Sequence, residues 1–189
     1  MTIETRSLSD SEIRALGTRI DRPLVLVGMM GVGKSTVGRK LAQLLDLPFA
    51  DADDEIEQAA QMSVGEIFDK FGEAYFRDGE RRVIARLLDG GPSVLATGGG
   101  AFVQPDTRAM ILARGVAVWL DSDVATLVER VGRRDTRPLL RDGDPKEIVT
   151  RLKAERESAY AEAPIKVMSQ GGPHGEAVGR ILQELGAWL

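Results

Sequence analysis

Short apolar runs alternate with stretches of helical periodicity along most of this chain. Five of these runs are rich in β-branched residues, which is typical of buried strands. Between them, apolar residues recur at three- and four-residue spacing, as on one face of a helix. This alternation predicts an α/β fold built on a parallel sheet. The predicted strands are Leu24 to Val27, Leu47 to Ala50, Ser93 to Ala96, Val116 to Leu120 and Ile165 to Met168.

Residues 1–20 form an extension ahead of this alternating pattern and predict one short helix. Ser9 is a suitable N-cap residue, Glu12 completes the capping-box spacing, and Gly17 is the expected stop. Nothing in this extension indicates chemistry. After the first strand, a second helix should carry its apolar residues on one side and end near Asp46. Those apolar residues are Val37, Leu41, Leu44 and Leu45.

Two further segments interrupt the pattern. Residues 52–92 predict two or three helices, one of them opened by a capping box from Ser63 to Glu66, and so form an all-helical insertion. Residues 130–146 contain glycine, aspartate, proline and many arginines but little apolar periodicity. That composition predicts a long mobile loop of the kind that often carries function. Asp144 and Pro145 then begin a helix that should run to about Tyr160.

Length and composition restrict the classes of function. A chain of 189 residues fits a single domain, here residues 21–189. With no cysteine and only one histidine, His174, the chain cannot build a disulfide, a thiolate metal site, a His-ligated zinc site or a histidine-based triad. The net charge of -4 argues against a general nucleic-acid binder. No apolar run is long enough for a membrane span. We therefore expect a cytoplasmic monomer.

The strongest chemical signal is the run from Gly28 to Thr36, which fits the phosphate-binding pattern G-x-x-x-x-G-K-[ST] in full. It lies between a predicted strand and a predicted helix, which is the required context. Its backbone N–H groups and the helix N-terminus should bind a polyphosphate, and Lys34 should reach the β- and γ-phosphates. Ser35 should bind Mg²⁺, with Thr36 at the helix start. The predicted ATP-binding residues here are Gly31, Val32, Gly33, Lys34, Ser35 and Thr36.

Several kinds of protein use such a loop. A GTPase switch would read guanine with an Asn-Lys-x-Asp motif, and this chain contains no asparagine. An ATP-driven motor would need an apolar strand ending in an acid, and Asp121 ends such a strand. The alternative, which we favour, is that Asp121, Ser122 and Asp123 cap the next helix.

Acidic residues and glycines follow the second and third predicted strands. In an extended backbone Asp51 and Asp53 would point the same way, toward the space above the phosphate-binding loop. Asp51 could then hold the water shell of Mg²⁺, and Asp53 could accept the hydrogen of an attacking hydroxyl. Alternatively, Asp53 only decorates a helix N-terminus. Thr97 precedes three glycines whose N–H groups are open to a ligand; these are Gly98, Gly99 and Gly100.

Arginines are the remaining candidates. Arg77 has acidic neighbours on its predicted helix, whereas Arg156 has none at three or four residues and is free to face a ligand. Their planar forks suit a carboxylate. A further group of arginines lies close together in the sequence and could form a nucleic-acid patch. No aromatic residue is interleaved among them, so we favour the other interpretation, a lid whose arginines close on the phosphates. This group comprises Arg130, Arg133, Arg134, Arg137 and Arg141.

Together these residues resemble the shikimate kinase family from about Leu24 to Leu182. The shared features are the loop ending Gly33-Lys34-Ser35-Thr36, the pair Asp51 and Asp53, Phe76-Arg77 with Glu80 following, Gly98-Gly99-Gly100, Arg137-Pro138-Leu139-Leu140, and Arg156 with Tyr160. The resemblance implies a three-layer P-loop kinase fold, like that of nucleoside kinases. Its parallel sheet would have five strands in the order 2-3-1-4-5, with a helical substrate-binding region at 52–92 and a lid at 130–146.

The resemblance also implies an activity, the phosphorylation of the 3-hydroxyl of shikimate by ATP with Mg²⁺. Arg77 and Arg156 would bind the shikimate carboxylate, and Glu80 would orient Arg77. Arg130 would lie against adenine, and Arg137 would be the lid arginine. The catalytic residues would be Lys34, Asp53 and Arg137. The full substrate-binding set would be Asp53, Arg77, Gly98, Gly99, Gly100 and Arg156.

The chain departs from the family pattern at Asp78-Gly79 and in its N-terminal extension, residues 1–20, which lies outside the family core, and several rival functions fit the same residues. Gly79 lies within the predicted helix of Arg77, where glycine costs about 1 kcal/mol relative to alanine, so Arg77 should be held less rigidly. Another small-molecule kinase of this architecture, such as one for gluconate or adenylylsulfate, remains an alternative. A nucleotide-dependent motor and a catalytically silent ATP-binding module remain two others.

Overall fold

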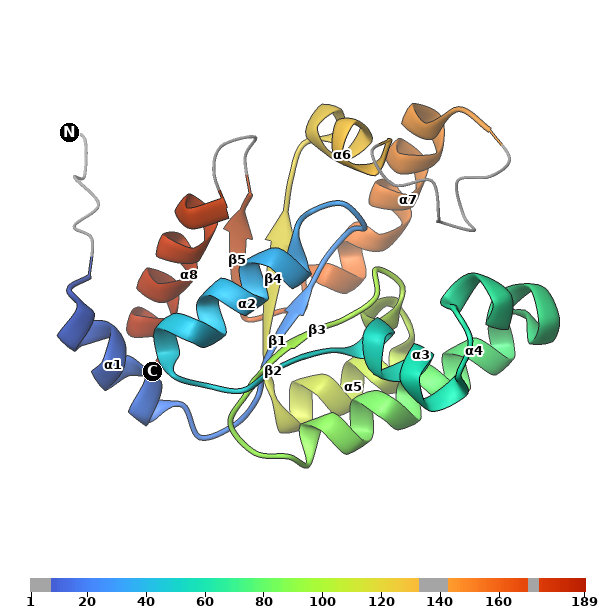
Figure 1. The fold of residues 1–189 in the computed structure, drawn as a ribbon. Helices are drawn as coiled ribbons and strands as arrows, with labels where there is room; N and C mark the ends of the chain where they lie inside the picture. Colours follow the sequence, from blue (N-terminus) through green and yellow to red (C-terminus); the bar gives the residue numbers. More distant parts are fainter. Residues whose placement is uncertain (1–7, 133–142, 170–173) are drawn as a thin grey trace.

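The computed structural model describes residues 8–132, 143–169 and 174–189. Its centre is a sheet of five parallel strands in the order β2-β3-β1-β4-β5 (Figure 1). This confirms the α/β class and the strand order 2-3-1-4-5. The strands are β1 Leu24–Val27, β2 Phe49–Asp51, β3 Val94–Ala96, β4 Val116–Asp121 and β5 Ile165–Met168.

The second strand begins two residues later than predicted and continues to Asp51. Leu47 is not part of it, because its N–H donates to the carbonyl of Ala42 in the turn that ends the preceding helix. Asp46 forms this turn in the left-handed conformation, with φ 55°. The other four strands lie where the apolar runs predicted them, within one residue at each end.

Helices cover both faces of the sheet. α1, α2 and α8 pack against one another on one face, while α5 lies on the other with parts of α4 and α7 (Figure 1). The helices are α1 Asp10–Arg19, α2 Lys34–Leu45, α3 Ala52–Ala60, α4 Val64–Leu88, the 3-10 turn η1 Ala101–Val103, α5 Pro105–Arg114, α6 Val124–Val131, α7 Pro145–Tyr160 and α8 His174–Trp188.

The capping signals mark helix starts correctly. Ser9 and Ser63 each accept a hydrogen bond from the backbone three residues later, and the glutamate at that position bonds back. Asp144 accepts from the N–H of Lys146 at the start of α7. The predicted stop of the first helix was wrong by two residues, because α1 continues through Gly17 to Arg19. A Cβ on Gly17 would lie 2.3 Å from the Leu45 carbonyl oxygen, so this glycine allows α1 to lie against α2.

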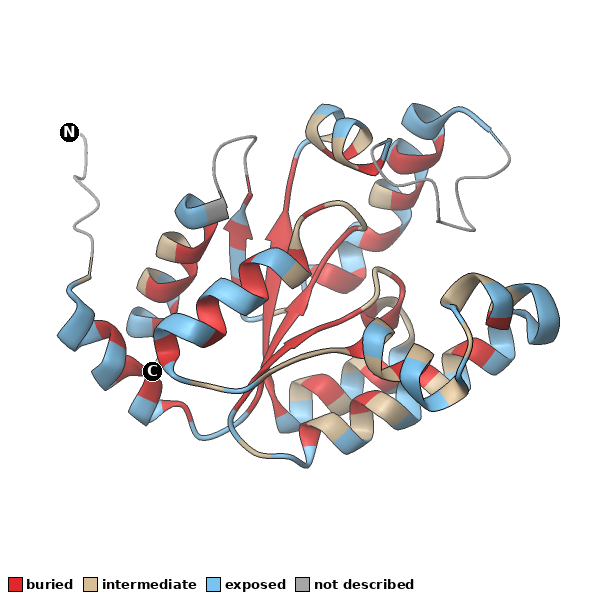
Figure 2. Ribbon diagram, viewed as in Figure 1, coloured by how far each residue is buried: buried red, intermediate tan, exposed pale blue. Residues whose placement is uncertain are grey.

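The buried residues of the described ranges form two hydrophobic cores, and Figure 2 colours the buried positions red. The main core surrounds the sheet and includes Ile13 and Leu16 of α1. Leu44 was expected on the buried side of α2, but it is 43% exposed because the helix buries Val37, Leu41 and Leu45 instead. No helix of the described ranges is long and apolar enough to span a membrane.

The second core lies between α3 and α4 and consists of Ile56, Ile67 and Phe76. α4 is not continuous, since Gly72 has non-helical dihedrals, φ 81° and ψ 172°. With this break, the segment after β2 contains three helical stretches, in line with the two or three expected. The segment therefore carries its own small core beside the carboxyl ends of the strands.

Candidate active site

The phosphate-binding loop connects β1 to α2 and is shaped by glycines in the left-handed region. Gly28, Gly31 and Gly33 have φ values of 135°, 81° and 97°, which other residues adopt only with strain. A Cβ on Gly28 would also lie 2.2 Å from the Leu120 carbonyl oxygen. The pattern of glycines in the sequence thus corresponds to real backbone requirements.

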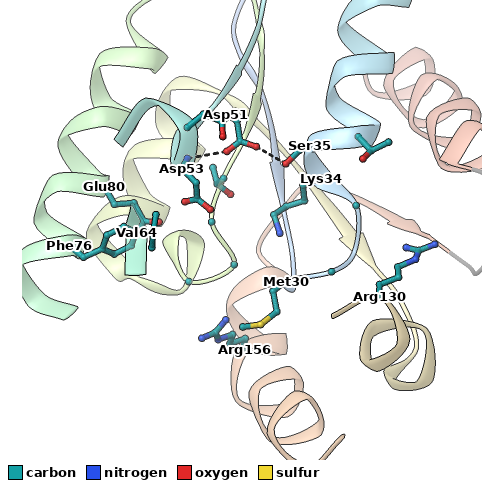
Figure 3. A pocket seen from close by; sticks show the side chains of 18 of the residues that line it. Met30, Lys34, Ser35, Asp51, Asp53, Val64, Phe76, Glu80, Arg130 and Arg156 are labelled. Carbon is teal, nitrogen blue, oxygen red and sulfur yellow. Dashed lines mark hydrogen bonds between the residues drawn. The ribbon is translucent and has the colours of Figure 1, made fainter. Parts of the chain in front are cut away.

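Two side chains at the start of α2, Lys34 and Ser35, line the cavity described below. Lys34 is buried, and its Nζ donates hydrogen bonds to the carbonyl oxygens of Gly28 at 2.8 Å and Met29 at 2.9 Å. The Oγ of Ser35 donates to the carboxylate of Asp51 at 2.5 Å (Figure 3). Thr36 is exposed in the first turn of the helix.

The cavity has a volume of about 860 Å³ and lies at the carboxyl ends of the strands, where open α/β sheets bind ligands. It is lined by every described residue predicted for the site except Val32, a buried residue of the same loop. Arg137 lies outside the described residues. The predicted residues along the cavity are Gly31, Gly33, Lys34, Ser35, Thr36, Asp51, Asp53, Arg77, Gly98, Gly99, Gly100, Arg130 and Arg156.

The two aspartates after β2 are placed differently from the sequence prediction. Asp51 ends the strand and is the N-cap of α3, where its side chain accepts from the N–H of Asp53 at 3.0 Å. Asp53 is not in extended backbone but in the first turn of this helix, and it reaches the cavity from there (Figure 3). The prediction that both carboxylates face the cavity is correct, but the predicted cause, the alternation of side chains in a strand, is wrong.

The ionisation of Asp53 is unfavourable in this position. Burial raises its pKa to about 6, with further increases from the negative charges of Asp51 and Glu80 and a partial offset by Lys34. A carboxyl group with a pKa close to neutral can exchange a proton under physiological conditions. Asp53 is therefore suited to receive a hydroxyl proton.

Arg77 is held by acidic neighbours on α4. Its Nη1 donates to Glu80 Oε2 at 2.6 Å, and its Nε lies 3.3 Å from Glu73 Oε1. Glu80 is almost completely buried, and its second oxygen, Oε1, has no hydrogen-bond partner among the described residues. Burial raises the pKa of Glu80 in spite of Arg77. The sequence indicated that Glu80 pairs with Arg77 but not that Glu80 is buried. In this buried position Glu80 Oε1 is an acceptor without a partner among the described residues.

The three glycines after β3 leave room for charged groups of the cavity. A Cβ on Gly98 would lie 2.8 Å from Glu80 Oε1 and 3.0 Å from Asp53 Oδ1. A Cβ on Gly100 would lie 2.3 Å from Nη2 of Arg77. Glycine is therefore favoured sterically at positions 98 and 100, since a side chain there would displace the acids or Arg77.

Arg156 approaches from α7, on the other side of the cavity. It is 8% exposed, and its Nη1 has no hydrogen-bond partner within the described part of the chain. The same atom would lie 3.5 Å from a Cβ on Gly99. A buried guanidinium with an unpaired donor is a strong candidate for binding an anionic group.

Arg130 lies at another edge of the cavity, on α6. Its Nη1 donates to the carbonyl of Val32 at 3.2 Å and is 3.5 Å from the Oγ of Ser169, which follows β5. Sequence reasoning did not assign an apolar wall to the cavity, because apolar side chains carry no chemical signal. This wall consists of Met30, Val64, Phe68 and Phe76.

The acid that a motor would need is placed elsewhere. Asp121 ends β4, and its carboxylate pairs with Lys153 of α7 and, at 3.1 Å, with Lys166 of β5. It does not line the cavity. Of the three residues expected to cap α6, only Asp123 does so, accepting from the N–H of Thr126 at 2.8 Å. Asp121 therefore does not supply the acid that the motor alternative needs beside the phosphate-binding loop.

Comparison with known proteins identifies the family. A family model described as shikimate kinase matches residues 30–186. The chain belongs to the shikimate kinase family. A shikimate kinase of Novosphingobium aromaticivorans is 64% identical over 186 residues, which cover 96% of both chains. The resemblance that the motifs indicated is confirmed.

Solved structures agree with the shikimate kinase fold. A shikimate kinase from Acinetobacter baumannii, in complex with shikimate, matches with a TM-score of 0.86 and 35% identity, covering 95% of this chain and 98% of that one. A gluconokinase from Sinorhizobium meliloti matches with a TM-score of 0.61 but only 18% identity, over 88% and 93% of the two chains. That second likeness shows a shared fold alone.

Proposed function

We propose that this protein transfers the γ-phosphoryl group of ATP to the 3-hydroxyl of shikimate, giving shikimate 3-phosphate and ADP. One observation carries this proposal. A single cavity joins a phosphate-binding loop to a protonatable carboxyl group, Asp53, and to two arginines suited to a carboxylate, Arg77 and Arg156. Shikimate presents both a carboxylate and ring hydroxyls, and family membership supports this acceptor over other hydroxy acids.

The loop between β1 and α2 would hold the phosphates of ATP. Its N–H groups and the positive end of α2 supply fixed dipoles, and Lys34 supplies a point charge. Lys34 now bonds to two loop carbonyls, and it would exchange them for phosphate oxygens. Arg130 would lie beside the adenine end of the nucleotide.

Mg²⁺ fits the residues at this end of the cavity. Ser35 and Asp51 offer only oxygen atoms and already share a hydrogen bond, so the carboxylate orients the hydroxyl. Ser35 would bind the ion directly, and Asp51 would hold its water shell. When bound, Mg²⁺ neutralises charge on the β- and γ-phosphates.

At the other end, Arg77 and Arg156 would bind the shikimate carboxylate from opposite sides of the glycine turn. Asp53 would then accept a hydrogen bond from the 3-hydroxyl. As the hydroxyl oxygen bonds to the γ-phosphorus and the bond to the β-γ bridging oxygen breaks, Asp53 would take the proton and ADP would leave. The sequence also assigns Arg137 to the transferring phosphates, and this assignment stays a prediction.

Four other expectations from the sequence stay predictions as well. They are the dependence on Mg²⁺, the monomeric state, the cytoplasmic location and the domain boundary at residue 20. Size-exclusion chromatography with light scattering tests the monomer directly, because a dimer would have twice the mass. Activity after chelation of divalent cations, with and without added Mg²⁺, tests the metal.

The proposed reaction is tested by ADP release with shikimate, gluconate or no acceptor. We expect release to depend on shikimate and the product to be the 3-phosphate. Equal rates with gluconate or with water alone would contradict the proposal. Lys34→Met should abolish turnover, because the phosphates lose their point charge, and wild-type rates in this variant would remove the loop from the mechanism.

The roles within the site are separated by kinetics. Arg77→Ala and Arg156→Ala should raise the KM for shikimate, by about 10-fold or more, with little change in the KM for ATP. Arg82→Ala is the matched control, since Arg82 lies on the same helix as Arg77 but is exposed and, among the described residues, pairs with Asp78. A selective loss of ATP binding in Arg156→Ala would contradict the carboxylate assignment.

A further inference from the structure

Tyr160 is a buried residue that has no assigned role in the proposed reaction. It is the last residue of α7 and only 1% exposed. Its ring lies 5.9 Å from that of Trp119. The hydroxyl donates a hydrogen bond to the carbonyl of Gly99 at 2.5 Å and lies 4.0 Å from the sulfur of Met29. Tyr160 therefore connects α7 with the glycine turn and with the phosphate-binding loop.

The hydrogen bond to Gly99 fixes a peptide group that would otherwise rotate easily. Three consecutive glycines have no side chains to restrict their backbone. In a trans peptide the carbonyl of one residue and the N–H of the next point in opposite directions. With the Gly99 carbonyl held by Tyr160, which does not line the cavity, the N–H of Gly100 points away from Tyr160.

That N–H is available to a ligand. No backbone carbonyl of a described residue accepts a hydrogen bond from the Gly100 N–H. Gly100 also lies against the guanidinium of Arg77, and Gly99 lies against that of Arg156. Next to these guanidinium groups, the Gly100 N–H would add a third donor for one anionic group.

We infer that Tyr160 is a positioning residue for the acceptor carboxylate: its hydroxyl locks the Gly99–Gly100 peptide so that the Gly100 N–H faces the carboxylate together with Arg77 and Arg156. Arg156 lies four residues before Tyr160, on the same face of α7. The same hydrogen bond therefore fixes the end of the helix that carries Arg156. This inference rests on the proposed function.

The hydroxyl of Tyr160 remains a donor at every working pH. Burial raises the pKa of Tyr160 to about 12, although the positive charge and hydrogen bonding of Arg156 and the charge of Arg77 act to lower it. The protonated form is the one that can donate to a carbonyl. The lock should therefore not loosen as the pH rises through the neutral range.

The test is Tyr160→Phe, which removes the hydroxyl and keeps the ring. The chain contains only one other tyrosine, Tyr75, which is 53% exposed and stacks on Phe71, so Tyr75→Phe is the matched control. We expect Tyr160→Phe to raise the KM for shikimate by about 5- to 10-fold, with unchanged KM for ATP. Tyr75→Phe should leave all three constants, kcat included, unchanged.

A second acceptor distinguishes positioning from general damage. With the methyl ester of shikimate, which lacks the negative charge, Tyr160→Phe and wild type should have the same kcat/KM, because the locked donor then has no anion to bind. Equal losses with both acceptors, or a raised KM for ATP, would mean a structural role and overturn the inference. If wild type itself fails to phosphorylate shikimate, the proposed function fails instead.

A third measurement keeps the native hydroxyl and does not depend on the stability of Tyr160→Phe. Tyr75→Phe protein produced with 3-fluorotyrosine carries a single fluorine label, at position 160. Its ¹⁹F resonance should shift when shikimate is added to saturation. An unchanged resonance at saturation would show that Tyr160 does not sense the acceptor and would overturn the inference.

Discussion

Asp53 is a carboxyl group whose environment opposes its charge, and this affects stability as well as catalysis. Its pKa is about 6 in the folded protein, against 3.8 in the unfolded chain. Between these values the folded state binds the proton and the unfolded state does not. Stability therefore falls as the pH rises from about 4 to about 6, and the full penalty is present above that range.

Asp53→Asn should remove this penalty while it lowers kcat. We expect the variant to be more stable than wild type by about 1 to 3 kcal/mol near pH 8, because a neutral amide is less costly to bury than a carboxylate. Near pH 4 the difference should disappear, since Asp53 is then protonated in the wild type. Urea unfolding of both proteins at the two pH values measures the difference in stability. A gain in stability of Asp53→Asn that is the same at both pH values would contradict the assigned pKa.

Gly100 and Gly79 allow a comparison of two glycine substitutions, one against the guanidinium of Arg77 and one two residues after Arg77 on α4. A Cβ at Gly100 would lie 2.3 Å from Arg77, whereas a Cβ at Gly79 meets no atom within 4 Å. Gly79 is thus a helix glycine without a steric reason. The expectation that it weakens the hold on Arg77 remains untested, although Arg77 does contact Glu73 and Glu80.

Gly100→Ala should therefore raise the KM for shikimate by about 10-fold or more, because Arg77 has to move. Gly79→Ala should leave that KM unchanged and stabilise the protein by up to about 1 kcal/mol, through the higher helix propensity of alanine. Steady-state kinetics and thermal unfolding of both variants check the pair. A normal KM in Gly100→Ala would show that the turn tolerates a side chain and that Arg77 adapts.

At the scale of elements, α7 is attached to the sheet through Asp121. This carboxylate binds Lys153 on α7 and Lys166 on β5, and it also accepts from the N–H of Ser122 at 2.8 Å. Burial works to raise its pKa, but these hydrogen bonds outweigh burial, and the pKa is lowered overall. The associated stability is present above the unfolded pKa near 4 and is lost as the pH falls through the folded value.

Asp121→Asn should thus destabilise the protein by about 2 to 4 kcal/mol near neutral pH, because it leaves two lysine charges without their partner. Asp123→Asn is the control, two residues away, since asparagine is an equally good N-cap and α6 should keep its start. Denaturant unfolding of the two variants distinguishes them. Equal, small effects would mean that the Asp121 pairs contribute little to the attachment of α7.

At the scale of the whole molecule, residues 8–20 are joined to the kinase fold by packing. Ile13, Leu16 and Ile20 belong to the main core, and α1 contacts both α2 and α8. The sequence indicated no chemistry for this segment. Its helix contributes to stability instead, because it covers apolar surface on the face of the sheet that is opposite α5.

Leu16→Ala should lower the free energy of unfolding by about 2 to 4 kcal/mol, because it leaves a cavity between α1 and α2. Neither KM should change, since α1 does not line the active-site cavity. Arg14→Ala, an exposed change on the same helix, should have little effect on stability. A single unfolding transition in Leu16→Ala is expected. A separate early loss of α1 would mean that this helix is not part of the cooperative unit.

Local features were readable from the sequence by itself. The glycines of the phosphate-binding loop, the capping boxes at Ser9 and Ser63, and the apolar strands were identified because each depends on neighbouring residues along the chain. The family followed from the same motifs. A local pattern fixes such features because φ/ψ preferences, caps and periodicity act over a few residues.

Only the tertiary structure decided how the candidate residues are buried and which groups they face. Tyr160 meets Gly99 across 61 positions of sequence. Asp53 enters the cavity from a helix, although extended backbone was expected, and Glu80 is buried with one oxygen that no described residue pairs. Burial, pKa and unpaired donors arise from packing between distant elements. The sequence therefore determined which chemical groups this protein has, and the fold decided how each group is charged and where it points.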